Sequence, residues 1–223
     1  MEIPKKIFVC YKYSDIVDGR EDSFNFRDDL VSRLGERGFI HKGENSESED
    51  MIGLNEGQII NKIAPYIKKS SITVLLLSPN VKASNWIPWE ISLSLRERAY
   101  DLEQNKTRNG IIGVYVPIGL NGEPDKNGNY SYYLYKKNCG TTYYVRELLP
   151  EIVIDNAFNL KNGEFECSYG CCKKVYSSSE GSYIELVKWH DFVSNMEHYI
   201  ENAWKRRNNF EDYDCRINLV NGR

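Results

Sequence analysis

An α/β fold, with a central parallel sheet and helices on both faces, is predicted by three features of this sequence. Two unbroken apolar runs, residues 72–77 and 111–117, are typical of strands that are covered on both faces. Shortly before the first of these runs, isoleucines recur at helical spacing, and this pattern predicts a helix over residues 56–69. Apolar runs and helical patterns alternate through the first half of the chain, as they do in βαβ units.

Each element has its own local signal. Residues 5–11 contain an apolar centre of Ile7, Phe8 and Val9, which predicts a first strand. Apolar residues from Phe24 to Leu34 recur at near-helical spacing, and a glycine at 35 or 38 would end that helix. The remaining core elements are expected in the order strand 39–41, helix 56–69, strand 72–77, helix 88–102 and strand 111–117.

A chain of 223 residues is long enough for one domain with elaborations. We expect a core over residues 1–118, a peripheral tyrosine-rich insertion over 119–183 and a C-terminal helix over 184–207. Residues 151–154 are a candidate for a last core strand. The final helix is predicted from one apolar face, formed by Trp189, Phe192, Met196, Tyr199, Ile200 and Ala203.

The tyrosines of the insertion allow two interpretations. Six of them crowd around Cys139 and Gly140, at positions 130, 132, 133, 135, 143 and 144. Such enrichment suits a contact surface or a lid over a ligand. It suits a half-buried edge strand equally well.

Charge and hydropathy exclude several classes of partner. The formal net charge of −3 argues against nucleic acid as a partner and provides no polybasic surface for a membrane. The cluster of Lys205, Arg206 and Arg207 suits the C-terminal dipole of the last helix. No run approaches the roughly 18 apolar residues of a membrane span, and the N-terminus has no signal-peptide pattern. We therefore expect a cytoplasmic protein.

The six cysteines of such a protein are expected to be free thiols rather than a disulfide framework. Cys167, Cys171 and Cys172 are close in sequence, but the three histidines match no zinc-finger spacing and no second CxxC is present. The sequence therefore predicts a loop with incidental thiols, and we expect neither a metal nor a bound cofactor.

The candidate catalytic residue is Glu90. It follows the apolar strand 72–77 and a short polar loop, where Ser84 or Asn85 could cap a helix with Pro88 in its first turn. Trp86 precedes Glu90 by four residues, so both share one side of that turn. Ligands of open α/β sheets bind beyond the carboxyl ends of the strands. An acid in a first helical turn also interacts favourably with the helix dipole, by roughly 0.3–1 kcal/mol, and this alternative needs no ligand.

Further candidate binding residues lie in two loops. Tyr11, Tyr13 and Asp15 follow the first strand, where they could stack on a base or bond a ribose, or simply pack within the loop. Ser84 and Asn85 could bind phosphate or ribose through loop amides, although helix capping is an alternative role for both.

These residues resemble the TIR family, and most closely the TIR subunit of bacterial Thoeris antiphage defence systems. Residues 8–15 look like the aromatic-rich opening of that group, and residues 71–79 look like its central strand. Trp86 and Glu90 match the Trp-x-x-x-Glu pattern around the TIR catalytic glutamate. The aromatic segment 189–204 is similar to the closing helix of these proteins.

The resemblance implies a flavodoxin-like TIR fold and cleavage of the nicotinamide–ribose bond of NAD. It implies that NAD is the substrate and that Glu90 is the catalytic carboxylate. A further implication is that Trp86 shapes the wall of the binding site beside Glu90. It also implies a cyclic ADP-ribose-type product, or an ADP-ribose conjugate, which acts as a signal on a separate effector protein. An unknown phage trigger and assembly into a homo-oligomer on activation are further expectations from the family.

Two other functions remain open on the residues alone. A TIR-like adaptor would work through protein contacts, and its function would survive replacement of Glu90 by Gln. A nucleoside or nucleotide N-glycosidase could use the same glutamate on another substrate. A phosphoacceptor receiver domain is disfavoured, because strand 72–77 is followed by Ser78, Pro79 and Asn80 instead of an aspartate.

Overall fold

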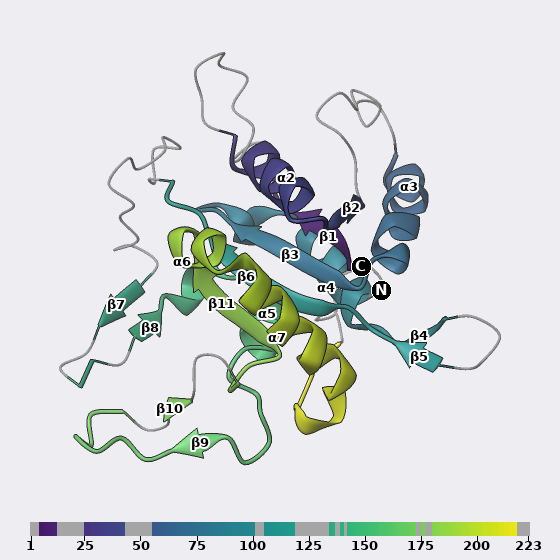
Figure 1. The fold of residues 1–223 in the computed structure, drawn as a ribbon. Helices are drawn as coiled ribbons and strands as arrows, with labels where there is room; N and C mark the ends of the chain where they lie inside the picture. The colour runs from purple at the N-terminus through teal and green to yellow at the C-terminus, as the bar shows by residue number, and fades with distance from the viewer. Residues whose placement is uncertain are drawn as a thin grey trace.

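The computed structural model describes residues 5–12, 25–42, 55–100, 105–118, 134–136, 139–140, 142–172, 175–176 and 180–217. Its centre is a five-stranded sheet in which every pairing is parallel (Figure 1). The strands are β1 (Lys6–Cys10), β2 (Ile40–Lys42), β3 (Ile72–Leu77), β6 (Gly110–Tyr115) and β11 (Ile184–Lys188). Their order, β11-β6-β3-β1-β2, is the flavodoxin-like arrangement of a doubly wound sheet, which confirms the predicted fold class.

Helices cover both faces of the sheet. The helices are α2 (Phe26–Glu36), α3 (Glu56–Lys69), α4 (Ile87–Leu95), α5 (Glu151–Asp155), α6 (Trp189–Ser194) and α7 (Met196–Asn208). Figure 1 shows α6 and α7 in front of the sheet and α4 and α5 behind it. Helix α4 packs against α3 and α5, whereas α7 packs on β6 and β3.

The apolar runs form the core as expected. All six residues of β3 and all six of β6 are buried. Helix α3 and strand β3 have the predicted bounds, and Asn55 begins α3 with a reciprocal capping box to Gln58. The apolar face predicted for the last helix is also correct, since Phe192, Ile200 and the other four residues of that face belong to the core or pack against it.

Three expected elements differ from the structure: the helix 88–102, the strand 151–154 and the first part of the helix 184–207. Helix α4 ends at Leu95, where Arg96 takes an extended conformation, and the chain continues into the hairpin of β4 (Arg98–Tyr100) and β5 (Asn105–Thr107). Residues 151–154 form helix α5 rather than a strand, because the Pro150 carbonyl accepts from two amides of its first turn. Short apolar runs do not by themselves distinguish the two structures.

The fifth strand of the sheet is β11, a segment that we expected to belong to the C-terminal helix. Residues 184–188 contain three apolar and two charged side chains without a regular period, and their backbone pairs with β6 along the whole strand. The helix begins only at Trp189, and Asn195 divides it into α6 and α7.

Two small hairpins belong to the segment between β6 and β11. Strands β7 (Leu134–Lys136) and β8 (Thr142–Tyr144) form one, and β9 (Glu164–Phe165) and β10 (Val175–Tyr176) form the other. The tyrosines 130, 132 and 133 of the expected insertion lie outside the described residues.

Candidate active site

Glu90 lies where the sequence predicted, at the start of helix α4 and beyond the carboxyl ends of the central strands. Strand β3 ends at Leu77, and the 3₁₀ turn Val81–Ala83 leads to α4. Glu90 is in the first turn of α4, and its side chain is only 7% exposed. A carboxylate is rarely buried to this extent without polar contacts, because burial removes its hydration.

One hydrogen-bond partner of Glu90 is Cys10, the last residue of β1. The Cys10 thiol donates a hydrogen bond to Oε2 of Glu90, with 2.7 Å between sulfur and oxygen. Both side chains are buried. Burial, followed by the negative charge of Glu90 and this hydrogen bond, raises the pKa of Cys10 well above its usual value. Cys10 therefore remains a neutral thiol that donates to the carboxylate.

The register of the sheet explains why these two residues meet. Paired residues of parallel strands point to the same face, and Cys10 pairs with Leu75, which in turn pairs with Gly113. Thr73, two residues before Leu75 on β3, is on that same face and its hydroxyl is 2.9 Å from the hydroxyl of Ser94 on α4. Cys10 thus faces helix α4 from the sheet. The sequence contained no direct signal for this contact, apart from the position of Cys10 at a strand end.

A buried polar cluster holds helix α4 against the sheet. Thr73 and Ser94 are in contact, and the Asn109 amide donates to the Thr73 hydroxyl at 3.0 Å and to the Ile67 carbonyl at 3.2 Å. All three polar side chains are buried. Together with the buried side chains of Ile87, Ile91 and Leu95, they set the position of the helix that carries Glu90.

The N-cap position of α4 is Trp86, which makes no side-chain capping bond, so neither Ser84 nor Asn85 is the N-cap that the sequence suggested. Ser84 lies two residues earlier and contacts the start of the helix. Its hydroxyl accepts from the amides of Trp86 and Ile87, each at 3.3 Å. Asn85 is exposed, and Trp86 is half-buried at the residue before the helix. The Trp86 carbonyl accepts from the Glu90 amide at 2.9 Å, which closes the first turn. Trp86 and Glu90 are therefore joined through the backbone.

The loop after β1 is described only in part. Tyr11 is half-buried and packs against the core next to Cys10, so it lies at the same strand end as the Cys10–Glu90 pair. Tyr13 and Asp15 lie outside the described residues. The structure thus brings Tyr11 and Glu90 to one end of the sheet, with Cys10 as a further member of the site.

A separate cavity of about 890 Å³ lies beside β11 and contains none of the predicted site residues. Its walls come from the end of α5, from β8, β9, β10 and β11, and from the C-terminal segment. Three cations and three acids line it: Arg146, Lys161, Arg216, Asp155, Glu164 and Asp214. Its size alone does not associate it with a reaction. The assignment of Glu90 rests instead on its place at the strand ends and on its burial.

Comparison with known proteins identifies the family of this chain. A family model of the Thoeris protein ThsB, TIR-like domain, matches residues 8–119. The chain belongs to this ThsB TIR-like family. The matched segment contains Cys10, Tyr11, Ser84, Trp86 and Glu90, so the candidate active site lies within the part of the chain that the family model covers. The two hairpins and β11 lie outside it.

A solved structure is also similar to this family member. It is the TIR-domain part of the activated Roq1 resistosome directly recognising the pathogen effector XopQ. The two chains share 18% identity with a TM-score of 0.33, and the match covers 52% of this chain and 59% of that chain. Among the described residues, no helix is both long and apolar enough to cross a membrane.

Proposed function

We propose that this protein cleaves the nicotinamide–ribose bond of NAD and that Glu90 is its catalytic carboxylate. The observation that carries the proposal is the buried Glu90 in a Trp-x-x-x-Glu helix start, within the segment that matches the ThsB TIR-like family. Membership of a family in which some proteins cleave NAD adds support, but a family does not by itself specify a reaction.

One carboxylate is sufficient for this chemistry. When the C–N bond breaks, its electron pair moves to the nicotinamide nitrogen, and neutral nicotinamide leaves without needing a proton. Positive charge then develops on the ribose, and a carboxylate beside the ring stabilises that charge in the transition state. The Cys10 thiol would orient the Glu90 carboxylate toward the substrate, because it occupies one oxygen of that group.

The fate of the ribosyl group decides the product. Attack by water gives ADP-ribose, whereas attack by a nucleophile within the same molecule gives a cyclic isomer, and an external nucleophile gives a conjugate. We propose a cyclic or conjugated product that acts as a signal on a separate effector in antiphage defence. This product requires exclusion of water from the site. We expect a lid formed by the tyrosine-rich insertion, together with residues of a second copy in an activated homo-oligomer, to provide it.

The first test compares the wild type with Glu90→Gln, each incubated with NAD in buffer and in lysate of phage-infected cells. Removing the carboxylate charge should reduce nicotinamide release by about 10²-fold or more. The matched control is Glu151→Gln, because Glu151 is an exposed acid in the first turn of another helix, α5. Chromatography with mass detection identifies both nicotinamide and the accompanying product.

The outcomes separate the proposed steps. Equal nicotinamide release by the wild type and Glu90→Gln would reject Glu90 as the catalytic group. Wild-type turnover that yields ADP-ribose alone, also in infected-cell lysate, would reject the cyclic or conjugated product. Absence of turnover by folded wild type in both conditions would favour a TIR-like adaptor.

A further inference from the structure

Four cysteines from two hairpins converge on one point in the structure. Cys139 lies between β7 and β8, whereas Cys167, Cys171 and Cys172 lie between β9 and β10. Their sulfur atoms all lie within 4.8 Å of one another. The sequence places Cys139 far from the other three, so only the fold assembles this cysteine cluster.

The spacing of the sulfur atoms matches a tetrahedral metal site. The distances are 3.6 Å between Cys139 and Cys172, 3.6 Å between Cys171 and Cys172, and 3.8 Å between Cys167 and Cys171. With Zn–S bonds of about 2.3 Å, sulfurs at the corners of a tetrahedron are about 3.8 Å apart. A disulfide would bring two sulfurs to about 2.05 Å. None of the four cysteines forms a disulfide in the structure.

The local backbone is shaped to present these sulfurs. Gly140 directly follows Cys139 and has a φ of +81°, and Gly170 directly precedes Cys171 with a φ of +63°. Residues with a Cβ rarely adopt this left-handed conformation. The Gly170 amide also donates to the Cys167 carbonyl at 2.9 Å, which closes a tight turn between two of the cysteines. Both glycines therefore let the chain turn sharply next to a cysteine.

The two hairpins also need a cross-link. Their strands have only three residues in β7 and β8 and two in β9 and β10. Isolated two-stranded hairpins of this size are marginally stable in water. A structural metal supplies folding free energy to elements that lack a core of their own.

We propose that Cys139, Cys167, Cys171 and Cys172 bind one Zn²⁺ ion in a structural site. Binding of Zn²⁺ to four thiols would form a tetrathiolate complex with a net charge of −2 and release four protons, without any redox change. All four positions are occupied by protein sulfur, so no position is open for a water or a substrate. This proposal replaces the sequence-based expectation of incidental thiols, and it does not depend on the activity of Glu90.

The metal would connect two parts of the wall of the cavity beside β11. Tyr144 of β8 and the residues Glu164, Val175 and Tyr176 of the other hairpin line that cavity. The Tyr144 hydroxyl also donates a hydrogen bond to the Leu186 carbonyl of β11, at 3.2 Å. Zinc at the cysteine cluster would therefore hold the β9–β10 hairpin beside an element that is already attached to the sheet.

The test is metal analysis of the full-length protein, purified under reducing conditions without chelators. We expect one equivalent of zinc per chain by mass spectrometry of the elements. Titration with a mercurial reagent should release that zinc as the thiols react. Cys171→Ser and Cys172→Ser should each lower the zinc content at least tenfold, whereas Cys215→Ser should retain it, because Cys215 is a thiol outside the cluster.

A second measurement uses only the wild type, so that unfolding of a variant cannot obscure the result. Protein stripped of metal is titrated with Co²⁺, which should produce thiolate-to-cobalt charge transfer and the intense visible bands of tetrahedral coordination. These bands should disappear when one equivalent of Zn²⁺ is added.

Three results would overturn the proposal. The first is purified protein that holds no zinc and contains two disulfides, which an intact mass lower than that of the reduced chain, by two hydrogens for each disulfide, would show. Another is iron instead of zinc in the purified protein, and the third is a cobalt spectrum that lacks thiolate charge transfer.

Discussion

Glu90 and Cys10 form a buried contact between residues that are 80 positions apart. The carboxylate retains a hydrogen-bond donor on one oxygen, which lowers the cost of burying it. The thiol in turn is held in its neutral form by burial and by the adjacent carboxylate. Each side chain thus controls the chemistry of the other, and Cys10 provides a chemical probe of the site that does not require turnover of NAD.

Cys10 should react slowly with iodoacetamide in the native protein, because it is buried and because burial, followed by the charge of Glu90, raises its pKa and keeps the reactive thiolate scarce. In Glu90→Gln the negative charge that raises the pKa of Cys10 is absent, so alkylation of Cys10 should become several-fold faster at pH 8. Peptide mapping by mass spectrometry measures the rate at each cysteine. Glu151→Gln is the control, and urea unfolding of each variant confirms that its native state persists. An unchanged rate at Cys10 in Glu90→Gln would show that the two side chains are not coupled.

Helix α7 approaches strand β6 closely because β6 begins with a glycine. A Cβ built on Gly110 would lie 2.1 Å from the carbonyl oxygen of Ala203, which is backbone and cannot rotate away. The same helix carries Ile200 and Ala203 into the core. The small residues at positions 110 and 203 therefore let a helix and a strand meet backbone to backbone.

Gly110→Ala should displace α7 and lower the free energy of unfolding by about 1–3 kcal/mol, which is the usual cost of overpacking. The matched control is Gly35→Ala in helix α2, where an added Cβ meets no atom within 4 Å. That change should stabilise the protein by up to about 1 kcal/mol, because alanine has the higher helix propensity. Urea unfolding measures both values, and equal effects of the two variants would contradict the close packing of α7 on β6.

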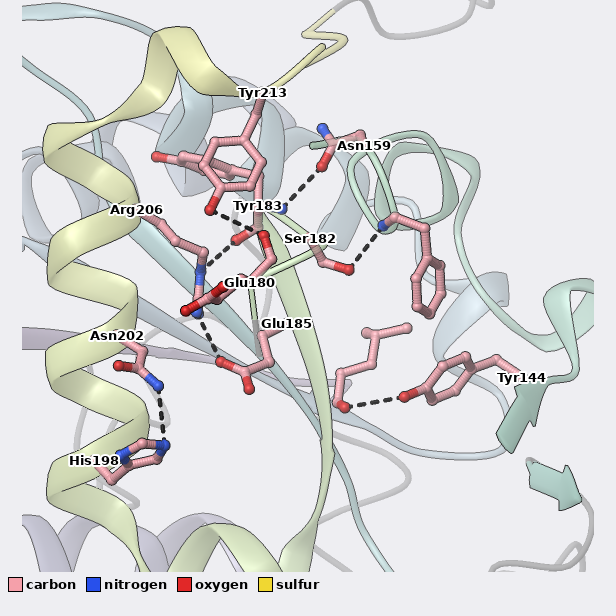
Figure 2. A network of polar contacts seen from close by, with 12 residues as sticks. Tyr144, Asn159, Glu180, Ser182, Tyr183, Glu185, His198, Asn202, Arg206 and Tyr213 are labelled. Carbon is pink, nitrogen blue, oxygen red and sulfur yellow. Dashed lines mark hydrogen bonds and ion pairs between the residues drawn. The ribbon is translucent and has the colours of Figure 1, made fainter. Parts of the chain in front are cut away.

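At the scale of the whole molecule, the last helix is attached to the edge strand of the sheet by a buried ion pair. Figure 2 shows Arg206 of α7 directed at Glu185 of β11 and at the Tyr183 carbonyl. The Arg206–Glu185 distance is 2.8 Å, and both side chains are 4% exposed. Burial raises the pKa of Glu185 although Arg206 opposes that shift. The pair therefore joins the C-terminal part of the chain to the sheet that carries the candidate active site.

Glu185→Ala should destabilise the protein by about 3–5 kcal/mol, since it leaves the Arg206 guanidinium buried without its carboxylate. The double variant Glu185→Leu/Arg206→Met should recover most of this loss, because neither buried charge remains. Unfolding in guanidinium chloride, which also screens exposed ion pairs, provides the measurement. A double variant that is as unstable as Glu185→Ala would show that the ion pair itself, rather than relief of a buried charge, stabilises the contact.

Local patterns predicted the elements of the core well. The isoleucine spacing of α3 and the apolar run of β3 are complete within their own segments, so both elements have the expected bounds. Residues 151–154 and 184–188 were assigned wrongly because a short run with mixed signals fits a strand or a helix. In those segments the surrounding structure decides: Pro150 begins a helix, and pairing with β6 makes a strand.

For the candidate site and the cysteine cluster, too, the sequence predicted what lies within one segment and missed the contacts between distant segments. Glu90, Ser84 and Trp86 lie within seven residues, and their spacing alone placed them on one strand–loop–helix unit. Cys10 was missed as a partner of Glu90, and Cys139 was missed as a neighbour of Cys167, because a residue's own segment does not encode which distant side chain it will meet.

The sequence by itself thus determined the alternation of strands and helices, the parallel sheet and the position of Glu90 in the first turn of a helix that follows a central strand. These properties follow from side-chain periodicity and from capping, which act over a few residues. Only the tertiary structure decided the Cys10–Glu90 contact, the Glu185–Arg206 ion pair, the fifth strand β11 and the convergence of four cysteines. These features depend on strand register and on packing between elements, and both are set by the folded chain as a whole.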